Sequence, residues 1–431
     1  MTSPIHTIED GGVTSAAGFK AGGVHAGFRD DPNRMDMALV EADELCPAAG
    51  VFTQNIFCAA PVIVSRENLN GCGAGLARAV VINSGIANAA TGSIGLDAAR
   101  KTCEIAADAI GCATEDVLVA STGVIGQLLD TTPFTTAIPL LHQSLKEQDV
   151  SGSTSGQDVV LGTQGLDAAR AIMTTDTHPK QAAVSYVSQD PDYEGTTFTV
   201  GGMAKGSGMI MPNMATMIAV ITTDAPLSSD TLHSALVAAA NQSFNKVTVD
   251  SDTSTNDTCY ALSSGKAAPG AAPFSVDSAA YSEFCVALNH VTQTLARQMA
   301  ADGEGATKLV TVTVRGAASE EDADKAARTV ANSPLVKTAI YGHDANWGRI
   351  AGALGRSGAS FKQEDVSIDI MGIPVCRNGL TVEFSEEEAL RRFELPEIVL
   401  EADLGAGTAE TTIWTCDFSH EYVTINGDYR S

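Results

Sequence analysis

Apolar residues recur along the chain with two periods, one typical of helices and one typical of strands. In residues 96–111, Ala98, Cys103, Ile105 and Ile110 are spaced as on one face of an amphipathic helix, with Asp97 in its first turn and Gly111 as its C-cap. Similar patterns predict helices over residues 229–245 and 278–302.

Strand-like runs alternate with these helices. The first ninety residues are typical of short strands joined by tight turns. Residues 117–126 predict a buried strand that runs into a glycine turn, and residues 307–316 predict a further strand. Residues 246–265 predict a strand, a polar loop and a second strand, and residues 397–427 a terminal antiparallel unit. The chain is therefore expected to have a mixed α/β fold with layers of sheet and helix.

Composition and charge narrow the classes of function. The 431 residues are 44% hydrophobic and carry a formal charge of −26, which disfavours nucleic acid and anionic membranes as partners. The amino terminus lacks a secretory pattern, and the longest apolar window, residues 208–221, is too short to span a bilayer, so a cytoplasmic protein is expected. Nine cysteines without a C-x-x-C motif, and histidines without paired spacing, predict no metal site.

Several familiar motifs are absent. In "GGMAKGSG" Lys205 precedes the glycine instead of following it, so the spacing of a phosphate-binding P-loop is missing. The G-x-G-x-x-G and G-x-S-x-G patterns do not occur. "DSDTSTNDT" begins like a calcium loop but has Thr255 at position six and Ala261 at position twelve. His343 beside Asp344 is best explained as part of a turn packed by Trp347.

The stretch "KGSGMIMPNMATMIAVITTDA", residues 205–225, combines a glycine-rich loop with a single hydroxyl before an apolar strand. Alone, Thr216 would be a β-branched strand residue. Pro212 and the nearby glycines could instead strain the Ala215–Thr216 peptide and promote an N-to-O acyl shift. Hydrolysis of the ester would leave Thr216 as a new amino terminus, whose α-amine, with a pKa of about 8, would act as base for its own hydroxyl.

At this point the chain resembles a known family. "AKGSGMIMPNMATM" is similar to the autoprocessing segment of the ornithine acetyltransferases, the bifunctional glutamate N-acetyltransferases of arginine biosynthesis. The likeness continues, in family order, through "NSGIANA", "STGVIG", "AIMTTDTHPK", "DTSTNDT", "DGEGATK", "GHDANWGRI" and "INGDYRS". The resemblance implies a layered αββα-type sandwich over residues 1–300, a smaller α/β domain over residues 301–431, and self-cleavage into chains 1–215 and 216–431.

The resemblance also implies a role for particular residues. Thr216 would carry the acetyl group from N-acetylornithine to glutamate in a ping-pong exchange, after cleavage between Ala215 and Thr216. Thr122 and Gly123 of "STGVIG" would form the oxyanion hole. The implied substrate contacts are Thr175, Lys205, Thr216, Glu304, Asn426 and Ser431. Many relatives have Thr at the last position, and Ser431 keeps the side-chain hydroxyl group.

Two alternatives remain open at this stage. The same cleaved threonine could give its acyl group to water, as in an N-terminal-nucleophile amidohydrolase or aminopeptidase, or the loop could stay uncut in a small-molecule binder. No cofactor is expected, although acetyl-CoA could serve as co-substrate. The resemblance further implies that the two fragments stay associated as a heterotetramer of two α and two β chains, with small-molecule substrates as the other partners.

Overall fold

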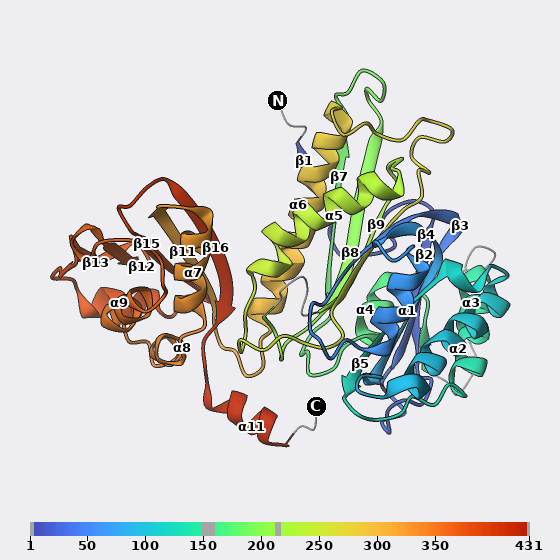
Figure 1. Ribbon diagram of the computed structural model, residues 1–431, viewed down its shortest axis with the longest axis horizontal. Helices are drawn as coiled ribbons and strands as arrows, with labels where there is room; N and C mark the ends of the chain where they lie inside the picture. Colours follow the sequence, from blue (N-terminus) through green and yellow to red (C-terminus); the bar gives the residue numbers. More distant parts are fainter. Residues whose placement is uncertain (1–3, 148–159, 212–216, 429–431) are drawn as a thin grey trace.

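The computed structural model describes residues 4–147, 160–211 and 217–428, whose strands form two sheets (Figure 1). The larger sheet has ten strands and the smaller has six. The strands of the larger sheet are β1 (Ile5–Thr7), β2 (Phe19–Val24), β3 (Met37–Phe52), β4 (Ala74–Ile86), β5 (Val117–Val124), β6 (Leu161–Gly162), β7 (Lys180–Val187), β8 (Thr197–Lys205), β9 (Ile218–Thr223) and β10 (Thr258–Ser263).

The long strand β3 joins the two halves of the larger sheet. β2 pairs with its first half and β10 with its second half, whereas β4 follows most of the opposite edge. A register shift between Glu41 and Cys46 interrupts the pairing with β4, and such irregularities increase the local bend and twist of a strand. The sheet therefore turns back on itself, with β7, β8, β9 and β10 in one layer and β2, β4 and β5 in the other.

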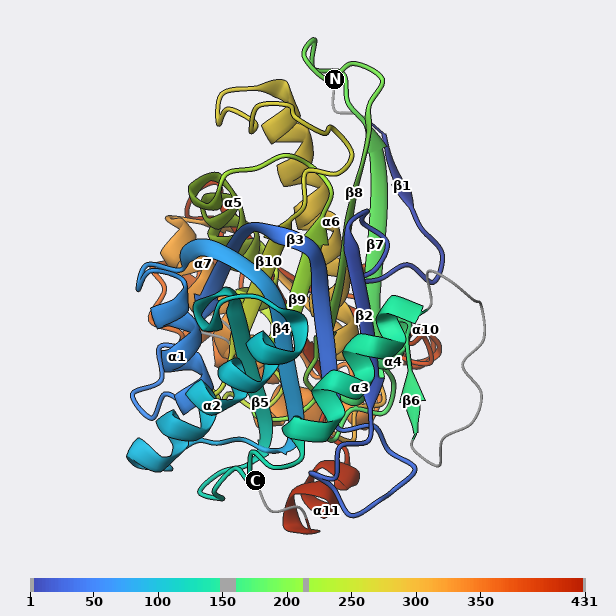
Figure 2. The ribbon, with the colours of Figure 1, turned by 90° about the vertical axis from the view of Figure 1, so that its right-hand side faces the viewer.

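Alternating side chains bury both faces of each layer. In β9, Val220 belongs to the apolar cluster between the layers, and the next residue, Ile221, to the cluster beneath α5 (Ser229–Gln242) and α6 (Ala279–Ala301). In β4, Val80 lies in the inner cluster and Val81 in the cluster beneath α2 (Gly92–Ile110) and α3 (Phe134–Glu147). The order helix, sheet, sheet, helix confirms the expected αββα sandwich (Figures 1 and 2).

Local sequence signals define many helix ends. Gly111 ends α2 in the left-handed conformation with φ of 85°, as a C-cap glycine does. Serine side chains cap α5, α6, α7 (Glu320–Ala331), α8 (Pro334–Tyr341) and α10 (Glu386–Arg392) by accepting a backbone N–H of the first turn. Three further helices are α1 (Ala60–Asn68), α4 (Gly165–Ala171) and α9 (Trp347–Gly355). Within the described ranges, every helix is too short or too polar to cross a membrane.

The smaller sheet and its helices lie beside the sandwich (Figure 1). Its order is β14 (Leu380–Thr381), β13 (Ile373–Arg377), β12 (Ser367–Ile370), β15 (Glu397–Asp403), β11 (Leu309–Ala317) and β16 (Ala409–Cys416). After β16 the chain leaves this sheet and forms α11 (His420–Asp428), which approaches the lower edge of the sandwich in Figure 1. The C-terminal helix thus connects the two parts of the molecule.

Several local predictions were wrong. The first ninety residues include strands of 16 and 13 residues instead of only short ones. Residues 246–265 contain one strand, β10, because Val247 and Val249 are buried by packing against other segments and not by pairing in a continuous ladder. β15 and β16 do not pair with each other, since β11 lies between them. Asp97 lies beyond the first turn because α2 begins at Gly92.

Candidate active site

A cavity of about 250 Å³ lies where the sandwich, the turn after α6 and α11 meet. Its lining includes residues from β5, from the end of β8 and from the polar segment that precedes β10. These elements are far apart in the sequence, yet the six expected site residues in the described ranges all line this one cavity. They are Thr122, Gly123, Thr175, Lys205, Glu304 and Asn426.

Thr122 and Gly123 lie at the end of β5, beside the end of β4. Parallel pairing aligns Thr122 with Ser84 and Gly123 with Gly85. Gly123 has a φ of 135°, and a Cβ atom there would lie 2.2 Å from the carbonyl carbon of Gly85. Only glycine fits this close approach of two backbones, and the resulting turn presents the Thr122 hydroxyl to the cavity.

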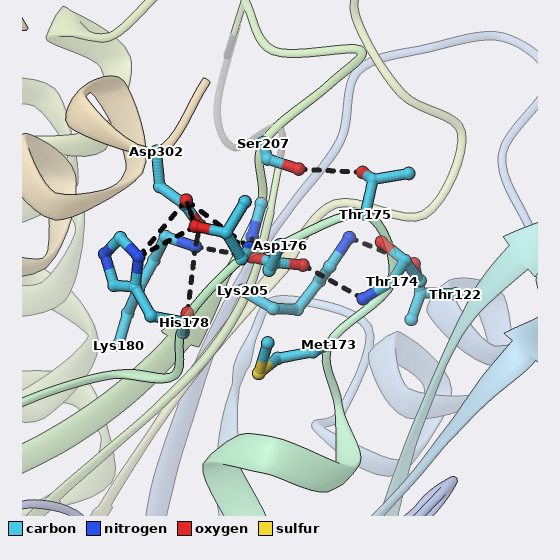
Figure 3. Close-up of polar contacts among 12 residues, drawn as sticks. Thr122, Met173, Thr174, Thr175, Asp176, His178, Lys180, Lys205, Ser207 and Asp302 are labelled. Carbon is cyan, nitrogen blue, oxygen red and sulfur yellow. Dashed lines mark hydrogen bonds and ion pairs between the residues drawn. The ribbon is translucent and has the colours of Figure 1, made fainter. Parts of the chain in front are cut away.

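Lys205 is the last residue of β8 and is buried, with 8% of its surface exposed. Its Nζ donates a hydrogen bond to Thr122 Oγ1 at 3.3 Å (Figure 3). Burial lowers the pKa of Lys205 by disfavouring its charged form, and Lys180 acts in the same direction, whereas the negative charges of Asp176, Asp257 and Glu304 oppose the shift. The cavity therefore contains an ammonium group beside a hydroxyl.

The loop that carries Thr175 is held from two sides. Arg34 Nη2 donates to the carbonyl oxygen of Thr174 at 2.6 Å, and Thr174 N–H donates to Asp176 Oδ2 at 2.9 Å. On the cavity side, the hydroxyl groups of Thr175 and Ser207 lie 2.7 Å apart (Figure 3). Ser207, which the sequence analysis did not single out, therefore orients the Thr175 hydroxyl.

Glu304 and Asn426 form a second polar pair in the cavity. Asn426 Nδ2 donates to Glu304 Oε2 at 2.7 Å, and Glu304 N–H donates to the carbonyl oxygen of Ser207 at 2.8 Å. α11 can bring Asn426 this close because Ser419 Oγ donates to Gly305 O at 2.5 Å. Gly305 must be glycine here, since its φ is 69° and a Cβ would lie 2.5 Å from Tyr422 N.

Three expected site residues, Ala215, Thr216 and Ser431, lie outside the described residues. The chain that leads toward the first two passes the cavity, because Met209 is part of its lining. Asp250 accepts the N–H groups of Met209 and Ile210 at 2.6 and 2.8 Å, and burial raises the pKa of this carboxyl group. Asp250 therefore fixes the backbone conformation of Met209 and Ile210, a few residues before Ala215 and Thr216.

Asn256 is a further residue whose role sequence reasoning missed. It belongs to "DTSTNDT", which carries part of the family resemblance without an assigned function. Its Nδ2 donates to the carbonyl oxygens of Ala87 and Ser121 at 2.6 and 2.8 Å, which ties this loop to the strand end that holds Thr122. The position within a resembling motif was the only sequence signal for it.

Two other predictions concern residues outside the cavity. His343 lies in the turn between α8 and α9, with φ of 52°, and stacks on Phe393, while Asp344 accepts a hydrogen bond from Asn346. These contacts support the structural interpretation of the pair. Among the described residues, no group of three or more His, Cys, Asp or Glu side chains is arranged to hold a metal ion.

The sequence comparisons with known proteins agree on one family. The ArgJ family model matches residues 20–431. The arginine biosynthesis bifunctional protein ArgJ of Chlorobaculum tepidum is 48% identical over 414 residues, covering 96% of each chain. The protein of the same name from Symbiobacterium thermophilum is 45% identical, covering 98% of this chain and 99% of its own. A crystal structure of the Bacillus halodurans ArgJ protein matches 48% of this chain and 97% of its own, with 41% identity and a TM-score of 0.47.

The family match spans the cavity and both sheets, and the relatives are covered nearly end to end. The chain therefore belongs to the ArgJ family, and it is a glutamate N-acetyltransferase of arginine biosynthesis.

Proposed function

We propose that acetyl transfer takes place in this cavity and that Thr216 carries the acetyl group. The observation that supports the proposal most is that Thr122, Lys205 and Glu304, from three distant segments, line the same cavity as Met209, seven residues before Thr216. Cleavage between Ala215 and Thr216 would give mature chains 1–215 and 216–431 and free the α-amine of Thr216.

In the first half-reaction, Thr216 Oγ attacks the acetyl carbonyl carbon of N-acetylornithine. The hydroxyl proton passes to the α-amine of Thr216, which returns it to the leaving amine as the C–N bond breaks. Ornithine departs and an acetyl ester remains on Thr216. The negative oxygen of the tetrahedral intermediate is stabilised by the Thr122 hydroxyl and the Gly123 N–H, and donors of this kind contribute about 2.7 to 4 kcal/mol each.

In the second half-reaction, the amine of glutamate attacks the ester carbonyl through the same oxyanion site. Its proton passes to the α-amine of Thr216 and then to Thr216 Oγ as the C–O bond breaks, which releases N-acetylglutamate. Because both half-reactions form a tetrahedral intermediate on the same oxygen, one pair of donors serves both.

Substrate recognition follows from the charges in the cavity. The Lys205 ammonium suits the carboxylate that both substrates carry, and the Glu304 carboxylate suits an ammonium group of the substrate or of Thr216. Thr175, Asn426 and Ser431 supply further polar contacts in this proposal. The proximity of Asn426 to Glu304 supports it, since their 2.7 Å hydrogen bond keeps the carboxylate oriented.

The proposal extends to the assembly and its surroundings. Residues 1–300 form the larger sandwich domain and residues 301–431 the smaller domain, and the cleaved fragments assemble as a heterotetramer of two α and two β chains. The enzyme works in the cytoplasm, where a biosynthetic acetyltransferase meets free glutamate.

The enzyme needs no cofactor, and acetyl-CoA is a second acetyl donor to glutamate. The word "bifunctional" in the names of the relatives supports this second donor. A steady-state assay with glutamate and acetyl-CoA tests the last point.

One experiment separates the transferase from a hydrolase. The purified protein is incubated with N-acetylornithine, with and without glutamate, and both acetate and N-acetylglutamate are measured. The proposal predicts rapid ornithine formation with glutamate present, little acetate, and no turnover by a Thr216→Ala variant. Acetate release that is indifferent to glutamate would favour the amidohydrolase, and activity in Thr216→Ala would remove Thr216 from the mechanism.

A further inference from the structure

A buried lysine lies behind the cavity, at the start of β7. Lys180 is fully buried, with Nζ 2.6 Å from Asp176 Oδ1 and 2.5 Å from Asp302 Oδ2 (Figure 3). Charged groups are rarely buried without paired partners, and these two ion pairs satisfy that requirement. Lys180 therefore links two acidic residues that are distant in the sequence.

Each of these acidic residues is attached to part of the cavity. Asp176 follows Thr175 directly and also accepts the N–H of Gly206, the residue after Lys205, at 2.7 Å. Asp302 precedes Glu304 by two residues in the turn after α6. Asp302 also accepts the N–H of Thr177 at 3.1 Å, which closes the connection between the two segments.

Lys180 lies between the carboxyl groups of Asp176 and Asp302, and the charge of Lys205 acts on Asp176 as well. The carboxyl groups of Asp257 and Glu304 also act on Lys205, and His178 Nδ1 lies 3.2 Å from Asp302 Oδ1. Burial alone would raise the pKa of Asp176, but the ammonium groups of Lys205 and Lys180, with hydrogen bonds from Lys180 and Gly206, lower it below its ordinary value. Without Lys180, the buried Asp176 carboxylate would lose its ion pair and interact more strongly with the Lys205 ammonium, which would draw Lys205 from the cavity.

We propose that Lys180 is a positioning residue for acetyl transfer, which through Asp176 and Asp302 holds Lys205 and Glu304 at their places in the cavity. Lys180 does not line the cavity. Its effect is transmitted by the Thr175 loop on one side and the Glu304 turn on the other. This inference rests on the proposed assignment of the cavity as the acetyl-transfer site.

The test compares Lys180→Met with a charge-balanced double variant, Lys180→Met with Asp302→Asn. Because Lys205 and Glu304 are the proposed substrate contacts, their displacement should weaken substrate binding, so Lys180→Met should lower kcat/KM for N-acetylornithine and glutamate by about tenfold to a hundredfold, mainly through KM. The double variant removes one negative charge together with the positive one, so it should recover part of that loss. Asp302→Asn alone, which keeps the shape of the side chain, provides a milder variant if Lys180→Met does not fold.

Arg78→Met is the matched control. Arg78 pairs with the buried Glu41 at 2.8 Å, near the end of β4 opposite to the cavity. The Arg78→Met substitution should lower the melting temperature without changing KM for N-acetylornithine or KM for glutamate. If Lys180→Met loses stability while both KM values stay unchanged, the inference is overturned. It is also overturned if the loss of kcat/KM in the double variant is the sum of the losses in the two single variants.

A further control separates the inference from the site assignment. Lys205→Met should raise both KM values if the cavity is the acetyl-transfer site. If Lys205→Met has no kinetic effect, the assigned site is wrong. If Lys205→Met is impaired while Lys180→Met and Asp302→Asn are both kinetically normal, the site stands and the role of Lys180 is refuted.

Discussion

The Lys205 ammonium donates a hydrogen bond to the Thr122 hydroxyl oxygen at 3.3 Å. An ammonium group has only donors, so the oxygen of Thr122 must be the acceptor. The hydroxyl proton of Thr122 is then available to a second acceptor in the cavity. This contact connects the proposed site for the substrate carboxylate with the proposed oxyanion site. Lys205 orients the Thr122 hydroxyl and also places a positive charge beside that hydroxyl.

The first prediction concerns the oxyanion donor. Thr122→Val keeps the shape of the side chain but removes the hydroxyl, so kcat should fall about 10² to 10³-fold, with KM changed less than about twofold. Thr122→Ser restores the donor and should recover most of the rate. Steady-state kinetics of ornithine release measure this, and equal activity of the Val and Ser variants would exclude a role for the hydroxyl.

The second prediction concerns pH and Lys205. Because the pKa of Lys205 is lowered in the folded protein, its charge should be lost at a pH below the value of about 10.4 of an ordinary lysine. Affinity for the substrate carboxylate is then present at lower pH and falls as the pH rises through the lowered pKa. Measuring KM for glutamate from neutral to alkaline pH tests this, and Lys205→Arg should move the loss of affinity to higher pH.

The third prediction uses the space beside Glu304. A Cβ atom at Gly208 would lie 2.2 Å from the Glu304 carboxyl carbon, which is the mobile end of a side chain, so Gly208→Ala should fold while displacing that carboxylate. KM for N-acetylornithine should rise while the melting temperature changes little. Gly352→Ala, at a helical position with open space around it, is the control and should leave KM unchanged. An unaltered KM in Gly208→Ala would argue against substrate contact by Glu304.

The fourth prediction concerns the backbone at Gly123. Gly123→Ala combines an unfavourable φ of 135° with a contact of 2.2 Å to the backbone of Gly85, which cannot move aside as a flexible side chain can. The free energy of unfolding should fall by more than the roughly 1 to 3 kcal/mol that backbone strain alone would cost. Activity should be lost as well. Gly126→Ala also has positive φ, at 81°, but open space, so it measures the strain by itself. Chemical denaturation compares the two, and equal losses would contradict the close approach.

Some of the fold could be predicted because its signals are local. The helix over residues 278–302 appears as α6, and the C-cap at Gly111 is where the sequence placed it, since apolar spacing and a terminal glycine act within a few residues. Val247 and Val249 carry a strand-like pattern, but their backbones meet Trp414 and Ile210 only at an isolated bridge and a single hydrogen bond, and their side chains are buried in the cluster beneath α5 and α6. Periodicity alone cannot distinguish these two causes of burial.

Among the site residues, some could be identified from the sequence and others depend on tertiary packing. The resemblance to the family identified Thr122 and Lys205, which are 83 residues apart, although no local pattern indicates that they touch. Lys180 follows "THP" and has the sequence context of a surface lysine, so its burial between Asp176 and Asp302 depends on tertiary packing. Ser207 was likewise visible only after its partner had been placed, and for Asn256 the motif indicated a position but not its contacts.

The proposed mechanism requires that Thr216, freed by self-cleavage, carries the acetyl group. The mass of the intact fragments after brief incubation with N-acetylornithine, in the absence of glutamate, tests this requirement. We expect two fragments, with one acetyl group added to the fragment that begins at Thr216 and removed again when glutamate is supplied. A single uncut chain in active enzyme, or an acetyl group on any residue other than Thr216, would contradict it.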